Sequence, residues 1–394
     1  MRRKFYCISM RPYCCFIFPA IAKRVFFEAA AALFIPFAAP LFFALHCSAE
    51  PSISPASAPQ KVHPERVSEE KMLEIYEEVK TPYKYGVVVE APQGMLADSP
   101  SVFQKGGKWY MYYIIQDGAG YSTHIAESCD LLNWTYKGEI LKRKNNSDWD
   151  SQQSAGYAAL FDYNWGGSNT LENFGGKYWM SYLGGALKGY ETDPLSIGLA
   201  CAADCSQAYE WERIPRPILS PSDADSRHFE KLTLYKSNII WDKNMTLGSR
   251  FVMYYNAKTE SGYERIGIAV SDDMLNWKRY GKDAVIDNGK GLSGDPQIVK
   301  IGDVWVMFYF GAGWANQGSR AAAFDTFACS YDLKNWTKWT GKNLVEPSES
   351  FDKTYAHKPW ILKHNGIVYH FYCAVGDRGR NIALATSKDL RGKK

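Results

Sequence analysis

Residues 98–134 read DSPSVFQKGGKWYMYYIIQDGAGYSTHIAESCDLLNW. Short runs of β-branched and aromatic residues follow one another here, and the Gly106-Gly107 turn separates the first two runs. The stretch lacks the three- to four-residue apolar spacing of a long helix. It therefore predicts four consecutive short strands, the last of them marked by the Asn133-Trp134 pair.

The same pattern recurs four more times, which is typical of a repeat protein. The copies open at Asp98, Gly167, Glu230, Asp295 and His357. Five four-stranded copies predict an all-β fold, namely a five-bladed β-propeller with a short N-terminal helix. A six-bladed ring would need a sixth copy. Two separate sandwiches would not explain one pattern that runs from Asp98 to Asp389.

The N-terminal region predicts export. A basic start and an apolar run at 29–45 precede a small-residue cleavage site after Ala49. Pro36 and Pro40 interrupt the run, which argues against a membrane span. A short helix begins after Ser68, a favourable N-cap. The predicted segments are a signal peptide over 1–49, a linker and short N-terminal helix over 50–84, and the catalytic propeller over 85–394. We expect a periplasmic or extracellular protein.

Composition excludes several classes of protein. The 394 residues carry a net charge of only +4, so no nucleic-acid-binding stripe is implied. Aromatic residues make up 15% of the chain, more than a core needs, and aromatic faces also stack on sugar rings. Five cysteines remain after cleavage, an odd number without a zinc-binding spacing. Cys201 and Cys205 either pair or are buried thiols.

Chemistry is expected where the leading ends of the inner strands meet at one mouth of the channel. Four of the five copies open with an ionisable side chain. We assign Asp98 as a general base, Glu230 or else His357 as a general acid, and Asp295 as the residue that orients one of them. His357 has two competing roles, as an ion ligand and as a structural residue. Lys358 is expected to point away from this site.

Loops around the same mouth are expected to bind substrate. The candidate substrate-binding residues are Trp149, Asn169, Trp314, Arg320 and Arg378. No cofactor is required and no metal ligands are assigned, although Ca²⁺ in the central channel is an open possibility. A homodimer through the N-terminal helix is a further expectation.

The repeated blades and their Ser-Asp…Asn-Trp edges, such as 271–277, resemble the five-bladed propeller glycoside hydrolases. Asp98 and Glu230 match the base and the acid of family 43, whereas Gly167 stands where that family has an Asp. The N-terminal helix and His357 are similar to family 117, in which a Glu follows the His, and Lys358 stands there in this chain. The resemblance implies a member of a distinct, related family.

The predicted function is therefore an exo-acting, inverting hydrolase that removes a terminal sugar from a plant or algal poly- or oligosaccharide. Inversion is expected because opposite blades would hold two carboxyl groups far enough apart to admit a water. A glycoside phosphorylase is the second interpretation, with Arg227, His228 and Arg378 available to bind phosphate. A non-catalytic sugar-binding propeller is the third. The copies differ at the channel end, which favours one catalytic pocket over five equivalent sites.

Overall fold

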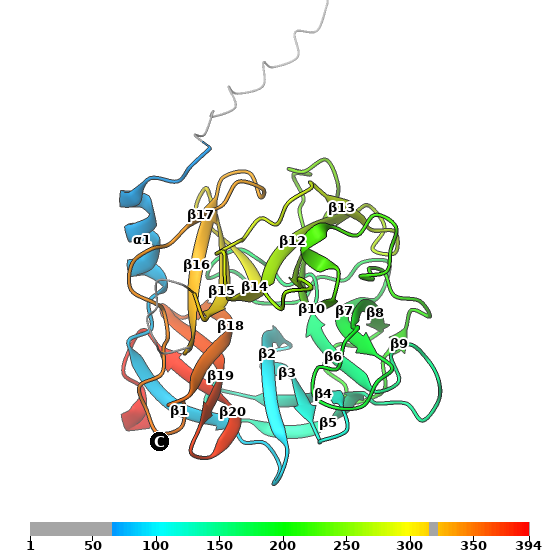
Figure 1. Cartoon of the computed structure of the whole chain (residues 1–394). Coiled ribbons are helices and arrows are strands. Elements are labelled where there is room, and N and C mark those ends of the chain that lie inside the picture. Colours follow the sequence, from blue (N-terminus) through cyan, green and yellow to red (C-terminus); the bar gives the residue numbers. More distant parts are fainter. Residues whose placement is uncertain (1–64, 315–321, 394) are drawn as a thin grey trace, which may run out of the picture. The chain divides into compact units, whose positions relative to one another are not determined.

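The computed structural model describes residues 65–314 and 322–393 (Figure 1). Within these ranges the chain forms one α-helix, twenty strands and two 3-10 turns, so the fold is all-β as predicted. The predicted signal peptide, most of the predicted linker and Arg320 lie outside the described residues. No helix in the described ranges is long and apolar enough to cross a membrane.

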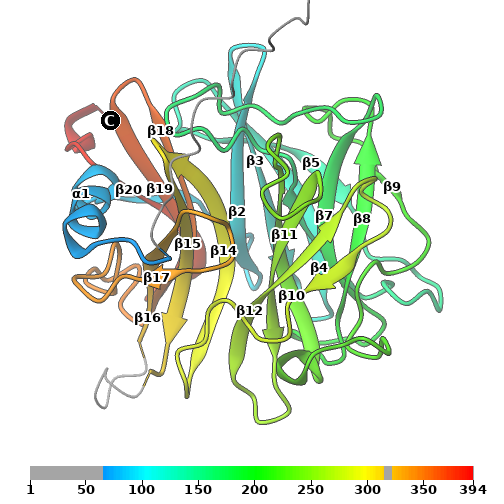
Figure 2. The same cartoon turned by 90° about the horizontal axis from the view of Figure 1, so that it is seen from above.

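The strands form three sheets of eight, four and eight strands, whose arrangement is drawn in Figures 1 and 2. In each larger sheet one parallel residue pair, Tyr121–Gln153 or Ala323–Tyr355, joins two antiparallel groups of four strands, so the described strands make five such groups. The first two groups are β2 (Leu96–Lys105), β3 (Lys108–Gln116), β4 (Tyr121–Ser128) and β5 (Thr135–Leu141), and β6 (Gln153–Ala158), β7 (Tyr178–Gly185), β8 (Ser196–Ala202) and β9 (Glu212–Arg213). The next two are β10 (Thr233–Trp241), β11 (Phe251–Lys258), β12 (Glu264–Ser271) and β13 (Lys278–Tyr280), and β14 (Leu292–Ile301), β15 (Val304–Ala312), β16 (Ala323–Ser330) and β17 (Thr337–Lys338).

The last group takes its fourth strand from the other end of the chain. It comprises β18 (Tyr355–His364), β19 (Ile367–Gly376), β20 (Gly379–Thr386) and β1 (Tyr83–Val89). β1 pairs antiparallel with β20, from Tyr83 opposite Thr386 to Val89 opposite Ile382. The segment after the N-terminal helix thus completes the fifth group, which has no Asn-Trp edge of its own.

The first strands of the groups contact one another in a cyclic order, β2, β6, β10, β14, β18 and back to β2. One contact between the last group and the first is a hydrogen bond, in which the Trp360 indole N–H on β18 donates to the Val102 carbonyl on β2 at 2.8 Å. Both residues are fully buried. The ends of the repeat are therefore held together by side-chain packing as well as by β1.

The Asn-Trp edges are a recurrent turn between the third and fourth strands. In the third group, Asp273 accepts hydrogen bonds from both the backbone and the side-chain N–H of Asn276. The Trp277 indole donates to the carbonyl of Met274, whose φ of 69° is left-handed. The same contacts recur at 128–134 and 330–336. These side-chain hydrogen bonds satisfy backbone amides of the turn, which have no partner in a neighbouring strand.

The second copy does not begin where the sequence predicts. Its first strand is β6, with the sequence QSAGYA, and Gly167 lies in the connection between β6 and β7. The prediction was wrong because β6 is short and made of small and polar residues, without the aliphatic run that marks the other first strands. The third copy is displaced less: Glu230 lies in a 3-10 turn (His228–Glu230), and β10 begins at Thr233.

The predicted N-terminal helix is confirmed as α1 (Glu69–Val79). The Ser68 side chain accepts a hydrogen bond from the Lys71 amide at 3.2 Å, as expected of an N-cap. Met72, Ile75 and Val79 are buried in a cluster with residues of β14, β15, β16, β18 and β19. Its apolar face is thus covered by its own chain, and the homodimer stays a prediction.

The five cysteines of the described residues carry free thiols, and four of them are buried. Cys201 and Cys205 are therefore buried thiols, which was one of the two interpretations.

Trp360→Ala tests the contact between the last group and the first. The change removes a fully buried indole and its hydrogen bond to Val102, and truncation of a buried Trp costs about 3–5 kcal/mol. We expect a lower midpoint of chemical denaturation, read by circular dichroism. The control is Tyr136→Ala, at a side chain 59% exposed, which should cost less than about 0.5 kcal/mol. Equal midpoints for the two variants would contradict this role.

Candidate functional site

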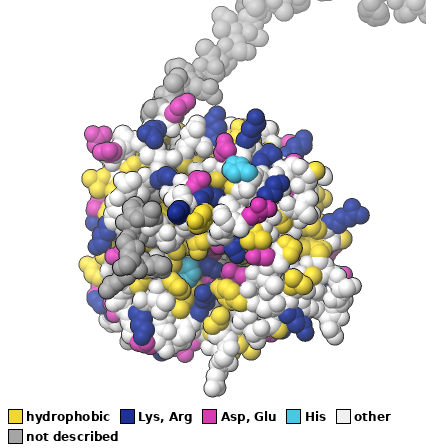
Figure 3. Space-filling view, in the orientation of Figure 1, with side chains coloured by type: hydrophobic (Ala, Val, Ile, Leu, Met, Phe, Trp, Pro, Cys, Tyr) yellow, Lys and Arg dark blue, Asp and Glu magenta, His cyan; other side chains and the backbone are white. Residues whose placement is uncertain are grey.

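All five strand groups contribute to one cavity of about 650 Å³. Six tyrosines line it: Tyr121, Tyr157, Tyr190, Tyr235, Tyr263 and Tyr355. Its charged lining includes Glu191, Lys236, Glu264, Asp295, Lys358 and Arg380. Aromatic walls with a few convergent polar groups are the usual composition of a small-molecule site. On the molecular face shown in Figure 3, basic and acidic side chains are interspersed.

The first strands of four groups are interrupted where they reach this region. The β2, β10, β14 and β18 ladders each skip two residues at the same place. Ser99, Asp295 and Lys358 occupy the interruption with left-handed φ values of 45°, 54° and 63°. A proline follows each of the three and cannot donate to a ladder, which is why the pairing breaks there.

The interruption changes which side chains reach the cavity. In a regular strand, neighbours such as His357 and Lys358 would point to opposite faces. Here both line the cavity, so the expectation that Lys358 points away was wrong. The sequence could not reveal this, because period-two alternation holds only while the ladder is continuous.

Asp98 is fully buried beside the cavity and is held by two cations. Its Oδ2 accepts hydrogen bonds from Lys358 Nζ at 2.9 Å and from Arg380 at 2.6 Å. Its Oδ1 accepts from the Ser99 amide at 2.8 Å. Burial alone would raise the pKa of Asp98, but Lys358, Arg380 and His357 outweigh it and hold the pKa far below the usual range. Asp98 is therefore a permanent anion.

Glu264, at the start of β12, has a carboxyl group whose pKa is shifted in the opposite direction to that of Asp98. It is buried in the cavity wall, and its Oε2 accepts a hydrogen bond from Asn256 Nδ2 at 2.9 Å. Burial raises the pKa of Glu264 to about 7, and the nearby charges of Glu191 and Asp295 act in the same direction. Glu264 is thus a group that can hold a proton near neutral pH.

Glu191 reaches the cavity from the connection between β7 and β8. Gln153 holds this loop by donating to the carbonyls of Leu187 and Gly189 at 2.8 and 3.0 Å. The Tyr121 hydroxyl donates to Glu191 at 3.2 Å, and Lys358 Nζ lies 3.6 Å from the same carboxylate. Lys358 therefore connects Asp98 to Glu191.

Two of the predicted site residues line the cavity itself. Asp295 accepts a hydrogen bond from the Ser99 hydroxyl at 3.2 Å. His357 Nδ1 lies 3.3 Å from the Cys373 carbonyl, and its ring meets Phe310 edge to face. Burial, with the positive charges of Lys358 and Arg380, lowers the pKa of His357 to about 3. The imidazole is thus neutral at neutral pH.

Glu230 does not line this cavity. It is fully buried, and its Oε1 accepts hydrogen bonds from the Arg227 amide and from Arg279 Nε, both at 2.5 Å. Arg279 also pairs with Asp223 and Asp225. Glu230 thus holds the loop before β10 onto the third group.

The candidate substrate-binding residues lie elsewhere in the described structure. Trp149 stacks on Tyr182 and donates a hydrogen bond to the Pro215 carbonyl. Asn169 donates to the Lys363 carbonyl at 3.1 Å. Trp314 lines a second cavity of about 610 Å³. Arg378 is exposed and pairs with Glu90 at 3.0 Å. None of these four lines the cavity that holds Glu264.

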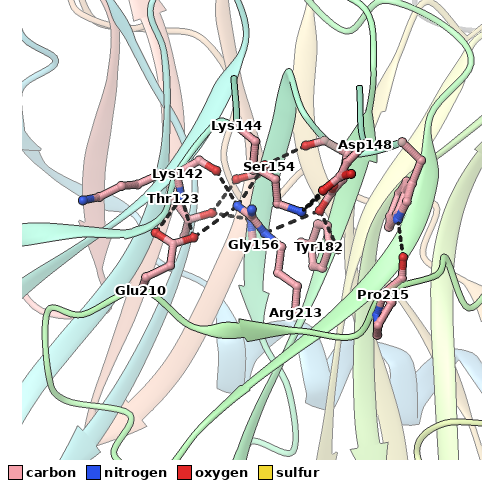
Figure 4. A network of polar contacts seen from close by, with 12 residues as sticks. Thr123, Lys142, Lys144, Asp148, Ser154, Gly156, Tyr182, Glu210, Arg213 and Pro215 are labelled. Carbon is pink, nitrogen blue, oxygen red and sulfur yellow. Dashed lines mark hydrogen bonds and ion pairs between the residues drawn. The ribbon is translucent and has the colours of Figure 1, made fainter. Parts of the chain in front are cut away.

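Figure 4 shows a network of polar contacts that includes Lys144, Tyr182 and Arg213. Asp150, the residue after Trp149, is buried and accepts hydrogen bonds from Lys144 and from the Tyr182 hydroxyl, at 3.0 and 2.9 Å. Arg213 belongs to the same network, with its Nε 3.5 Å from Asp150 Oδ2. This network joins the first two strand groups and supports β6. In the described residues, no cluster of three or more His, Cys, Asp or Glu side chains is arranged to hold a metal ion.

This chain is similar to proteins of known structure, although no protein-family model matches it. The BT0996 protein, solved in a complex described by the term RGII, is 46% identical with a TM-score of 0.79. A structure described as a glycoside hydrolase is 47% identical with a TM-score of 0.78. Each match covers 82% of this chain and 97% of the other protein.

More distant matches share the fold or a part of the sequence. A thermostable family-43 glycoside hydrolase is 14% identical with a TM-score of 0.53, over 76% of this chain and 96% of that protein. The β-1,2-mannobiose phosphorylase of Thermoanaerobacter sp. (strain X514) is 30% identical over 141 residues. That match spans 31% of this chain and 42% of the phosphorylase.

Asp98→Asn tests the buried ion pairs. The change leaves Lys358 and Arg380 without their shared anion, and removal of one partner from a buried pair costs about 3–5 kcal/mol. We expect a lower denaturation midpoint, measured by intrinsic fluorescence at neutral pH. The matched control is Asp389→Asn, at an exposed pair with Arg391, which should leave the midpoint unchanged. A variant at Asp98 as stable as the wild type would contradict the ion-pair role.

Proposed function

We propose that this chain, which belongs to the same family of glycoside hydrolases as the two solved structures that are 46% and 47% identical to it, hydrolyses glycosidic bonds in the cavity between Glu191 and Glu264. The five strand groups would be the blades of a closed five-bladed propeller. The enzyme would be exported and would act on the terminal sugar of a plant or algal carbohydrate, with inversion.

One observation carries the proposal: two carboxyl groups with different surroundings line one cavity. Glycoside hydrolysis needs one protonated carboxylic acid and one carboxylate on either side of the bond. Burial raises the pKa of Glu264 to about 7, so a substantial fraction of this group carries a proton at neutral pH, which suits a donor to the leaving oxygen. Glu191, between Lys358 and the Tyr121 hydroxyl, would be the carboxylate that activates water.

The roles predicted from sequence are revised in this proposal. Asp98 would orient Lys358 and Arg380 instead of acting as the base, because a permanently ion-paired carboxylate is a weak proton acceptor. Glu230 does not line the cavity, and neutral His357 has no acidic proton of the required strength, so Glu264 takes the role of acid. Asp295 would contact the substrate from the cavity wall.

A glycoside phosphorylase is the second candidate. The partial match to β-1,2-mannobiose phosphorylase favours it, as do the cations Lys236, Lys358 and Arg380 that line the cavity. Activity that depends on inorganic phosphate, with release of a sugar phosphate, would identify this reaction. Hydrolysis at full rate in phosphate-free buffer supports the proposed hydrolase, and proton NMR of the first-formed product then tests inversion.

Glu264→Gln tests the acid. We expect kcat/KM on an oligosaccharide to fall by about 10²- to 10⁴-fold, the usual effect of one general acid. A glycoside with a dinitrophenyl leaving group should lose less, since that group departs without a proton. In the wild type, kcat/KM should fall as the pH rises through about 7 and Glu264 loses its proton. The variant should lack this alkaline limb.

The matched comparison is Glu230→Gln, the same change at a buried glutamate outside the cavity. In the Glu230 variant, kcat/KM should still fall as the pH rises through about 7. The ratio of kcat/KM for the dinitrophenyl glycoside to kcat/KM for the oligosaccharide should equal that of the wild type, even if the variant is less stable. Loss of the limb in the Glu230 variant, and its persistence in the Glu264 variant, would overturn the assignment.

A further inference from the structure

A buried ammonium lies in the wall of this cavity and makes no hydrogen bond to any described residue. Lys236 lies in the interruption of β10, and its side chain is 1% exposed. Its Nζ has no hydrogen-bond partner in the described part of the chain. It lies over the ring of Tyr157, 5.4 Å from the ring centroid. Because burying an unsatisfied charged donor is costly, its retention in a cavity wall points to a bound ligand atom.

The neighbour of this ammonium restricts what that atom can be. Asp295 Oδ2 lies 3.8 Å from Lys236 Nζ, too far for a direct hydrogen bond. A carboxylate placed at Lys236 would be repelled by Asp295. A hydroxyl group suits the position, because its oxygen accepts from the ammonium while its hydrogen is donated to the carboxylate.

A hydrogen-bond acceptor without a partner among the described residues lies on β11, the strand that pairs with β10. Asn256 on β11 faces the interrupted part of β10, and its Nδ2 is used by Glu264. Its Oδ1 is buried and has no hydrogen-bond partner in the described residues. Asn256 also packs on Gly294, next to Asp295, where an added Cβ would lie 2.2 Å from its Nδ2. Only a glycine at position 294 therefore leaves room for the side-chain amide of Asn256.

The other buried cations of the cavity are already paired. Lys358 lies within 4 Å of both Asp98 and Glu191, and Arg380 binds Asp98. No surplus of buried positive charge is left to hold an anionic sugar. The amide oxygen and the ammonium–carboxylate pair together offer sites for hydroxyl groups.

We propose that Lys236, Asp295 and Asn256 bind free hydroxyl groups of the terminal sugar. The substrate is then a glycoside of a neutral sugar, and neither a uronic acid nor a sugar blocked at the bound hydroxyl is accepted. This inference rests on the proposed function, because it places the terminal sugar beside Glu264.

The experiment uses 4-nitrophenyl glycosides of neutral pentoses and hexoses, and of the matching uronic acids. The wild type should cleave a neutral member and not its uronic counterpart. For that substrate, Lys236→Met should lower kcat/KM by about 10- to 100-fold, as expected for a lost hydrogen bond to a charged group. Its melting temperature should fall, because the change leaves the buried Asp295 carboxylate without the cation 3.8 Å away, so kcat/KM is compared at a temperature at which both proteins are folded.

Monodeoxy versions of the accepted glycoside locate the contact. With the wild type, kcat/KM for one of the deoxy glycosides should be about 10- to 100-fold below that for the parent glycoside. With Lys236→Met, kcat/KM for the same two glycosides should be almost equal, because the variant already lacks the hydrogen bond that the deoxy position removes. The control is Lys231→Met, an exposed lysine bonded to Ser226 outside the cavity, which should stay within twofold. Additive losses for every deoxy position, or preference for a uronide, would overturn the hydroxyl site.

Failure of the proposed function is recognised separately. If the wild type cleaves none of the glycosides, with or without phosphate, hydrolysis is refuted for this set. The hydroxyl site is then tested by thermal shift with the free neutral sugars and the free uronic acids. A neutral sugar that stabilises the wild type but not Lys236→Met supports the site. Stabilisation by a uronic acid alone, or by no sugar, overturns it.

Discussion

The buried carboxylate of Asp98 and its two cations are the interaction on which the site depends. Asp98 belongs to the first strand group, whereas Lys358 and Arg380 belong to the last. A carboxylate with no exposure to water needs compensating charge, so the two ends of the repeat must meet at this point. The same contacts fix Lys358 against Glu191 and Arg380 against the Tyr190 hydroxyl, at 3.6 and 2.6 Å. The contact between the first and last strand groups and the geometry of the site thus depend on one set of ion pairs.

A second constraint is the left-handed residue in three of the first strands. Such a conformation costs about 1–3 kcal/mol for a residue other than glycine, and at Asp295 and Lys358 it brings a charged side chain to the cavity. Lys236, in the equivalent interruption of β10, lacks any hydrogen bond to a described residue. These features reduce stability. Local strain and unsatisfied charge concentrated at one cavity are typical of a functional site.

The sequence predicted the all-β repeat, the helix α1 and the approach of Asp98, Asp295 and His357 to one place. These predictions succeeded because the apolar second strands and the turn glycines recur at regular intervals. They failed at β6, whose small and polar residues carry no strand signal, and at Glu230, which lies ahead of its strand.

Glu191 and Glu264 were missed for different reasons. Glu191 lies on a loop, whose conformation depends on contacts such as those of Gln153 with the loop carbonyls. Glu264 begins a third strand, β12. At or next to the starts of four of the five third strands lie Tyr121, Glu264, Ala323 and Arg380, all of which line the cavity. The raised pKa of Glu264 depends on burial, which only the folded chain supplies.

The central claim is that the cavity raises the pKa of Glu264 to about 7. The direct measurement is a carbon-13 NMR titration of protein labelled at the glutamate carboxyl carbons, with Glu264→Gln used for assignment. The account predicts one resonance with a midpoint near pH 7 that is missing from the spectrum of the variant. If every glutamate titrated near the ordinary value of about 4.3, or if the resonance near pH 7 survived in the variant, the account would be contradicted.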